Sequence, residues 1–204
     1  MNTATATLRF GSDDRAGATS IGLWVFMGVA TALFSLFVWA YVMRMSGSDA
    51  VALALPWQLW LSSTLLVAGS ATLQRAHAAA RGARAADTRR LLLAGGLCAL
   101  AFLAVQLWAW QALLAAQVLP AGNPGGSFFY LLTAMHGFHV MGGLAGWAWT
   151  ARAAGRPAMV PTELAWRIAL CARYWHFLLA VWVVLFAMLG WLTPEVARII
   201  CGTA

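Results

Sequence analysis

Two histidines in an apolar stretch are the side chains of this sequence best suited to chemistry. His136 and His139 lie three residues apart in the segment FFYLLTAMHGFHVMGG, residues 128–143, which is otherwise almost entirely apolar. On a helix, this spacing places both rings on nearly the same face. Imidazoles in such a position could ligate a metal ion, carry a proton or fasten neighbouring helices together.

A metal or haem site would need more ligands than this pair supplies. A catalytic zinc ion usually has three protein ligands, and haem needs an axial ligand and room for its macrocycle. His176, in the last hydrophobic run, is a candidate third ligand, but no carboxylate accompanies it. We therefore expect no metal site and no catalytic residue in this chain. We interpret His136 and His139 as helix-packing residues that form hydrogen bonds between helices or contact lipid.

Three glycines continue the face of the histidines at helical spacing, namely Gly142, Gly143 and Gly146. Gly142 and Gly146 form a small-xxx-small pattern, which in membranes is typical of helices that approach one another closely. We therefore expect this face to pack against a neighbouring helix rather than to face lipid.

The composition indicates that these residues lie in a lipid bilayer. The chain has 204 residues, of which 62% are hydrophobic and 9% are charged, whereas about 25% are charged in a typical soluble domain. All 13 basic residues are arginines, and they lie mainly between the hydrophobic runs. This placement favours a role in membrane topology, and we expect no binding of nucleic acid.

Five hydrophobic runs have the length of a membrane-spanning helix, which is about 20 residues. The polar N-terminus lacks the basic start and apolar core of a signal peptide, so we expect the first run to remain as a membrane anchor. We predict an all-α integral membrane protein: a polar cytoplasmic segment at 1–19, a five-transmembrane-helix bundle at 20–193 and a tail at 194–204. The five runs are roughly 21–43, 57–73, 91–118, 128–150 and 169–192.

The arginines predict how the bundle is oriented. Ten of them lie at the N-terminus or in the second and fourth connections, whereas only Arg44 and Arg198 lie on the opposite side, with Arg173 inside the last run. Cytoplasmic loops carry an excess of basic residues. We therefore expect a cytoplasmic N-terminus and a periplasmic C-terminus.

None of the six acidic residues lies in a hydrophobic run; the sequence places all of them in loops or tails. Proton pumps and ion-coupled transporters usually carry carboxylates along the path of the ion. The runs also lack the paired Gly/Pro interruptions that accompany transporter sites. A small transporter is therefore disfavoured as the function of this chain alone.

The segment CARYWHFLLAVW, near the start of the last run, combines a cation with aromatic rings. Arg173 is expected near the cytoplasmic interface, where a guanidinium can reach lipid phosphate, with His176 one turn deeper on the same face. With Trp175 and with Trp24 of the first run, they form a candidate phospholipid-binding site. The alternative is an interfacial anchor that holds no particular lipid.

Four segments resemble the cytochrome oxidase subunit III family in its short, five-helix form. GLWVFMGVATALF and LPWQLWLSSTLLVAGSATLQRAHAAAR resemble the first two helices of that family. FFYLLTAMHGFHVMGGLAGW resembles the fourth helix, and RYWHFLLAVWVVLF resembles the last helix with its Tyr-Trp-His-Phe motif. The resemblance covers about residues 20–192, in the order and spacing of the family.

The resemblance implies an accessory, non-catalytic subunit of a haem-copper terminal oxidase, which reduces oxygen in aerobic respiration and pumps protons. Haem and copper would lie in the partner catalytic subunit, with no cofactor in this chain. The chain would pack against subunit I, with subunit II in the same complex, in a bacterial inner membrane. It would hold phospholipids in a V-shaped cleft between its first two helices and the rest, and it would support proton uptake.

Three positions depart from the family pattern. Where relatives commonly carry an acid, this chain has Ala30, Ala109 and Leu179. Functions of the family that depend on these acids are therefore in question here, whereas packing and stabilisation are not. A subunit III-like protein of a nitric oxide reductase system and an independent membrane cytochrome stay open as alternatives.

Overall fold

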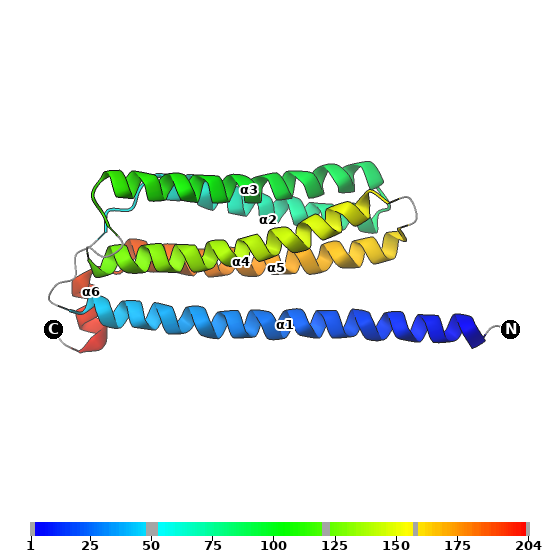
Figure 1. The fold of residues 1–204 in the computed structure, drawn as a ribbon, viewed down its shortest axis with the longest axis horizontal. Helices are drawn as coiled ribbons and strands as arrows, with labels where there is room; N and C mark the ends of the chain where they lie inside the picture. The colour runs from blue at the N-terminus through cyan, green and yellow to red at the C-terminus, as the bar shows by residue number, and fades with distance from the viewer. Residues whose placement is uncertain (1–2, 48–52, 120–122, 157–158, 203–204) are drawn as a thin grey trace.

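The computed structural model describes residues 3–47, 53–119, 123–156 and 159–202, with side chains from residue 17 onward. Within these ranges, the five longest helices run alongside one another, and a short sixth helix lies across one end of the bundle (Figure 1). The helices are α1 (Thr3–Met45), α2 (Gln58–Arg81), α3 (Ala85–Ala115), α4 (Pro124–Ala154), α5 (Pro161–Trp191) and α6 (Pro194–Cys201).

Four of these helices contain stretches that are long and apolar enough to cross a membrane. They are Gly17–Met45, Ala85–Ala115, Pro124–Ala154 and Pro161–Trp191. Helix α2 is not among them, because polar residues such as Ser62, Ser63 and Thr64 interrupt its apolar sequence. The chain is thus an all-α, multi-pass membrane protein, whereas the count of five spans and the orientation of the termini stay predictions.

The helices extend beyond the hydrophobic runs from which they were predicted. Asp87 and Glu163, which the sequence placed in loops, lie in the first turns of α3 and α5. An acidic side chain is favourable there, because the helix dipole makes the N-terminus electropositive. At the start of α4, the Asn123 side chain accepts a hydrogen bond from the backbone N–H of Gly126 at 2.8 Å. Polar and capping residues therefore lengthen α3, α4 and α5 at their N-terminal ends. At the other end, α3 stops at Ala115, before the predicted end of its run at 118. Asp49 lies outside the described residues, and Asp13 and Asp14 lie where only the backbone is described.

The helices form three layers, with α4 and α5 in the middle (Figure 1). Helix α2 packs on α3 and α5, whereas α1 packs on α4, α5 and α6. Among the described residues, α1 and α2 make no contact with each other. The arrangement therefore differs from the V-shaped cleft that the resemblance implied, since the first two helices do not form a pair against the rest.

Aromatic rings fill the centre of the bundle, and hydrogen bonds between side chains join its layers. The largest fully buried side chains include Trp175, Trp182 and Phe102. The indole N–H of Trp182 donates to Ser63 Oγ at 2.8 Å, which joins α5 to α2. Trp147 on α4 donates to the Leu92 carbonyl on α3 at 2.7 Å. Such bonds matter in a membrane because no water is available to satisfy a polar group.

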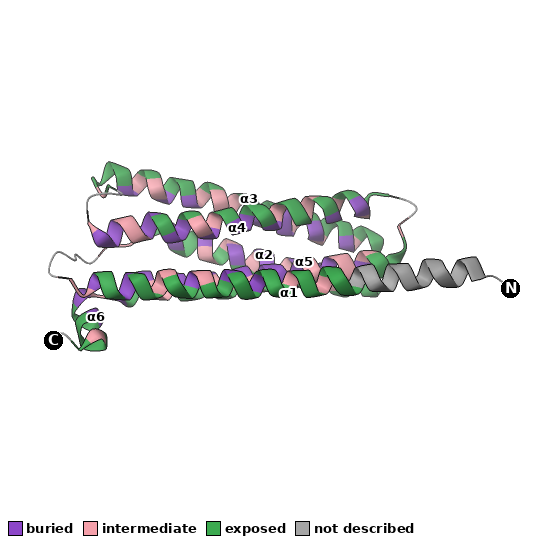
Figure 2. Cartoon of the chain, turned by 60° about the horizontal axis from the view of Figure 1, so that its bottom comes forward, coloured by how far each residue is buried: buried purple, intermediate pink, exposed green. Residues whose placement is uncertain are grey.

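Helix α1 is the most peripheral of the four apolar helices. In its most apolar window, 17% of the residues are buried, against 33–44% for the other three. The described part of α1 accordingly shows a broad exposed face (Figure 2). In a bilayer, that face would contact lipid or another membrane protein.

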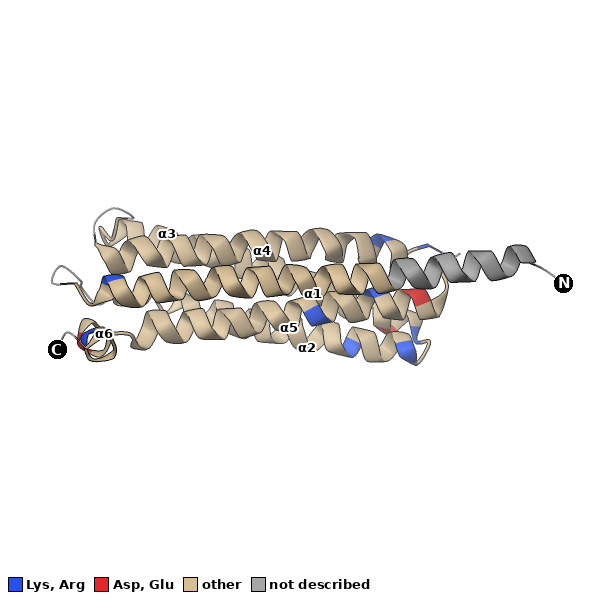
Figure 3. Ribbon diagram, turned by 90° about the horizontal axis from the view of Figure 1, so that it is seen from below, with Lys and Arg blue, Asp and Glu red and all other residues tan. Residues whose placement is uncertain are grey.

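Most of the charged residues lie near the ends of the bundle, whereas Arg173 lies within α5 (Figure 3). Most described arginines lie at the end where α2 finishes and α5 begins, whereas Arg44 and Arg198 lie at the opposite end. The side chains of Arg9 and Arg15 lie outside the described part of the chain. The asymmetry that the sequence predicts is therefore a feature of the folded bundle among the described arginines.

Candidate functional site

His136 lies at the point where four helices meet. Its ring is fully buried, with ring centroids 6.3 Å from Phe34 of α1, 5.7 Å from Phe102 of α3 and 5.1 Å from Trp182 of α5. Neither ring nitrogen has a hydrogen-bond partner among the described residues. The imidazole therefore contributes as a packed aromatic ring rather than as a hydrogen-bonding group.

His139 continues this contact one turn along α4. Its Nδ1 lies 2.7 Å from the Met135 carbonyl, which can only accept, so Nδ1 carries the proton. The ring packs against Phe34 and Phe26 of α1, with centroids 5.1 and 5.9 Å away. The hydrogen bond between helices at this level uses the backbone instead, because the Tyr174 hydroxyl donates to the His139 carbonyl at 3.0 Å.

The expected hydrogen bonding between helices through the imidazoles is therefore not what the structure shows. One imidazole has no polar partner among the described residues, and the other bonds within its own helix. The physical reason is the composition of the facing helices, which present phenyl and indole rings at this level. That His136 and His139 join helices stays a prediction, and the contacts available for it are those between their rings and the aromatic rings of neighbouring helices.

The three glycines of α4 occupy two different environments. A Cβ placed on Gly143 would lie 3.0 Å from Tyr174 Cε1 and 3.4 Å from Leu178 Cδ1, so α5 approaches closely there. A Cβ on Gly142 or Gly146 would meet nothing within 4 Å. Gly143 thus lies at a close contact of helices, whereas a side chain at Gly142 or Gly146 would have open space; all three glycines line that space.

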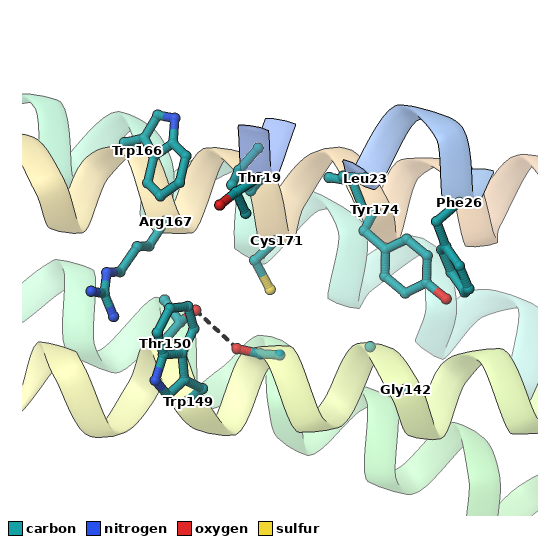
Figure 4. Close-up of a pocket in the computed structure, with 13 residues that line it drawn as sticks. Thr19, Leu23, Phe26, Gly142, Trp149, Thr150, Trp166, Arg167, Cys171 and Tyr174 are labelled. Atoms are coloured by element: carbon teal, nitrogen blue, oxygen red, sulfur yellow. Dashed lines mark hydrogen bonds between the residues drawn. The ribbon is translucent and has the colours of Figure 1, made fainter. Parts of the chain in front are cut away.

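That space is a cavity of about 310 Å³ between α1, α4 and α5. Its wall is formed by Gly142 and Gly146, by Leu23 and Phe26 of α1, and by Cys171 of α5, among others (Figure 4). The lining is almost entirely apolar. A cavity of this kind suits an aliphatic chain better than a charged or strongly hydrated ligand, because it offers few hydrogen-bonding partners.

Arg167 supplies the charge at one side of this cavity. Its guanidinium lies over the Trp149 ring, 4.2 Å from the ring centroid, and donates to Glu163 Oε1 at 2.6 Å. The ion pair and the stacked ring hold this side chain in one place between α4 and α5. The cavity thus combines an apolar interior with a charged side chain, Arg167, in its lining.

The candidate lipid residues form a second, exposed site between α1 and α5. Arg173 Nη1 donates to Ser20 Oγ at 3.3 Å, and the guanidinium carbon lies 5.4 Å from the centroid of the Trp24 ring. Trp24 is 59% exposed, and Arg173 and His176 are also exposed. The Nδ1 of His176 pairs with the Ala172 carbonyl, which leaves Nε2 for another partner.

Trp175 is placed apart from these three residues. It is 1% exposed and lies among the largest buried side chains of the bundle. The reason is the helical period, because each residue of α5 is turned by about 100° from the one before it. Tyr174 and Trp175 therefore face the core, whereas Arg173 and His176 face outward. The structure therefore brings together Arg173, His176 and Trp24, adds Ser20 and leaves Trp175 inside the bundle.

The three positions that depart from the family pattern all lie in apolar packing. Ala30 is 3% exposed and Ala109 is fully buried, whereas Leu179 is half-buried against the core. An isolated ionised carboxylate at such a position would be costly without a partner. The apolar residues are thus consistent with their surroundings.

Metal-ligating side chains do not converge in the described part of the chain. No group of three His, Cys, Asp or Glu residues there lies close enough to hold a metal ion. His136 and His139 are flanked by aromatic rings, as described above.

The cavity and Ser20 are the features that sequence reasoning missed. The spacing of Gly142 and Gly146 is the same whether a helix packs on them or a cavity opens beside them. Ser20 directly precedes the first hydrophobic run, so its pairing with a cation on the last run could only come from the fold.

The chain is similar to bacterial proteins named probable cytochrome c oxidase subunit 3. It is 30% identical over 125 residues to that of Mycobacterium bovis, 29% to that of Mycobacterium leprae and 30% to that of Nocardia farcinica. Each match covers 61% of this chain and 61% of the relative, so the match spans about three fifths of the relatives' length. No family model matches the chain. The relatives confirm the resemblance to the subunit III family that the motifs indicate.

Proposed function

We propose that this chain is an accessory, non-catalytic subunit of a haem-copper terminal oxidase, related to subunit III and embedded in a bacterial inner membrane. The observation that carries the proposal is the similarity to proteins named as subunit 3 of cytochrome c oxidase. The fold is consistent with a structural role for this chain, because His136 packs among aromatic rings at the centre of the bundle.

In this proposal, the partner catalytic subunit holds the haem and copper, and this chain stabilises that subunit by packing against it. The partners are oxidase subunit I and, in the same complex, subunit II. Ala30, Ala109 and Leu179 carry no ionisable group. Any support of proton uptake would therefore act through subunit I rather than through a relay at these positions.

The proposed topology has five spans, with α2 as the fifth, a cytoplasmic N-terminus and a periplasmic C-terminus. The support for this topology is the gathering of most described arginines at one end of the bundle (Figure 3). Basic residues of this kind are retained on the cytoplasmic side. The length of α2, at 24 residues, is sufficient for a span.

The function is tested by purifying the tagged chain in mild detergent, with intact-complex mass spectrometry and an optical spectrum of the same sample. We expect a large haem-containing subunit to co-purify, and we expect the haem signal to disappear when that subunit is stripped away. A colourless chain that purifies alone would contradict the proposal. Haem retained by the isolated chain would instead indicate a membrane cytochrome.

The activity of the co-purified complex distinguishes an oxidase from the remaining alternative, a nitric oxide reductase system. We expect the complex to consume oxygen with a reduced electron donor. Consumption of nitric oxide without consumption of oxygen would indicate a subunit III-like protein of a nitric oxide reductase system.

We further propose that Arg173, His176 and Trp24 bind the headgroup of a phospholipid. A guanidinium donates well to a phosphate, and the Trp24 ring and Ser20 position it between α1 and α5. Arg173→Gln should lower the amount of phospholipid that co-purifies, measured by lipid mass spectrometry. Arg90→Gln, at an exposed arginine near the start of α3, is the matched control and should leave it unchanged. Equal lipid content in both variants would contradict the site.

A further inference from the structure

The C-terminal segment that follows the last long helix is itself a well-defined helix. The Thr193 side chain accepts a hydrogen bond from the Val196 N–H at 3.4 Å, and Pro194 occupies a first-turn position that suits its fixed φ. The helix ends at Gly202, whose φ of 67° is the left-handed conformation that glycine adopts readily. A hydrogen bond from its own backbone N–H, and then one from the Thr193 hydroxyl, lower the pKa of Glu195. Its carboxylate is thus ionised at the N-terminal end, where the helix dipole favours a negative charge.

Helix α6 presents three faces to three environments. One face packs against the bundle, where Ala197 is fully buried and Cys201 Sγ lies 3.8 Å from Met43 Sδ of α1. A second face carries Glu195 and Arg198. The third face is apolar and exposed; it consists of Val196 at 41%, Ile199 at 69% and Ile200 at 56% exposed. The spacing of these residues, i, i+3 and i+4, places them together on one side of the helix.

The position of α6 relates this apolar face to a membrane boundary. Only Leu192 and Thr193 separate it from α5, a helix long and apolar enough to span a membrane. The helix lies across the end of the bundle rather than along it (Figures 1 and 3). A helix that begins two residues after a span and turns across it lies at the level where that span leaves the bilayer.

Exposed tryptophans at the same end of the bundle mark that level independently. Trp191, at the end of α5, is 81% exposed, and Trp57 and Trp60, at the start of α2, are 59% and 68% exposed. Tryptophan is enriched where the acyl region of a bilayer meets the headgroups. The exposed apolar face of α6 thus lies at the end of the bundle that these tryptophans mark as a membrane boundary.

We propose that α6 is an interfacial helix that lies flat in the boundary of the bilayer, which is the outer boundary in the topology proposed above. Its apolar face of Val196, Ile199 and Ile200 enters the acyl region, Glu195 and Arg198 face the headgroups and water, and its buried face holds the end of α1. The partner is a lipid surface. Amphipathic helices lie in bilayers in this way, with the apolar side a few ångströms below the headgroups. Because α1 is the most peripheral apolar helix, a membrane-held contact at its end restricts its separation from the bundle.

The test is a spin-label scan of α6 in the full chain, purified with whatever subunits accompany it and reconstituted in lipid bilayers. Single cysteines replace Val196, Ile199 and Ile200, with Glu195→Cys and Arg198→Cys as matched controls on the same helix. The native cysteines are first removed by Cys98→Ala, Cys171→Ala and Cys201→Ala. These five label positions are on the surface, so none of the labels has to be accommodated in the core.

Oxygen concentrates in the acyl region, whereas a nickel chelate stays in water, so their effects on label relaxation report the surroundings. We expect oxygen to dominate at positions 196, 199 and 200 and the nickel chelate to dominate at 195 and 198. A stronger nickel effect at all five positions would place α6 in water and overturn the proposal. Immobile labels at 196, 199 and 200, shielded from both reagents, would show a protein partner on this face and would overturn it as well.

Discussion

A buried histidine with no polar partner in the described part of the chain distinguishes the centre of this bundle from an ordinary membrane-protein core. Burying a polar group without a hydrogen bond is unfavourable, yet the His136 ring lies among Phe34, Phe102 and Trp182. The packing of the His136 ring against its neighbours therefore has to offset the free-energy cost of burying its two nitrogens. The two contributions can be separated by substitutions that remove one and keep the other.

Substitution of His136 should show that its volume matters more than its nitrogen atoms. His136→Ala would leave a void where four helices meet, and we expect a loss of about 2–5 kcal/mol in the free energy of unfolding. His136→Leu keeps most of the volume and removes the two ring nitrogens, which have no hydrogen-bond partner among the residues described, so we expect stability to be retained or raised. The measurement is unfolding of the purified protein in detergent. If both variants were destabilised equally, His136 would have a polar partner in the assembled protein.

At the scale of helices, glycine allows two different relations between neighbours. A Cβ on Gly96 of α3 would overlap the ring of Trp147 of α4. The indole N–H of Trp147 donates to the Leu92 carbonyl, one turn from Gly96 on α3. A Cβ on Gly146 of α4 would meet nothing within 4 Å. The same residue type therefore permits close contact of α3 and α4 at one site and borders a cavity at the other.

These two glycines yield a matched pair of substitutions. Gly96→Ala should displace the Trp147 ring, and we expect a loss of about 1–3 kcal/mol in stability, as in other overpacked cores. Gly146→Ala should be neutral or stabilising, because alanine favours the helix by about 1 kcal/mol over glycine and has room here. The thermal unfolding midpoints of both variants check this. A larger loss for Gly146→Ala would mean that α4 is packed more closely there than the structure shows.

At the scale of the whole molecule, the number of spans decides on which sides of the membrane the termini lie. If α2 crosses the membrane with the four more apolar helices, the two ends of the described chain lie on opposite sides. If α2 does not cross, the ends lie on the same side. Helix α2 packs on α3 and α5 along the bundle, which favours a crossing despite its polar residues.

Reporter fusions test this topology directly. Alkaline phosphatase fused after residue 204 should be active, because the enzyme folds in the periplasm, whereas green fluorescent protein fused there should be dark. The same reporters fused before residue 1 should give the reverse pattern. Matching patterns at both ends would contradict the five-span topology and would leave α2 outside the membrane.

The sequence by itself determined the class of the protein and the places of its long helices. A run of about 20 apolar residues in a bilayer has to form a helix, since every backbone group must be satisfied within the segment. For the same reason, the run at 128–150 lies within α4, and the run at 169–192 lies within α5 except for its last residue. The motifs of these two helices also indicated a resemblance to a family, and proteins named as members of it are similar to the chain over 125 residues. Helix ends were less certain, because polar turns such as those of Asp87 and Glu163 depend on capping rather than on hydropathy.

Only the tertiary structure decided which faces meet. The periodicity placed His136, His139 and the glycines on one side of α4 but could not say which rings would face them or that Gly146 would border a cavity. It paired Trp175 with Arg173 by proximity in sequence, whereas the fold buries one and exposes the other. In a membrane, apolar residues face both lipid and the core, so hydropathy does not distinguish the two. The distinction comes from shape complementarity between helices, which depends on all of them at once.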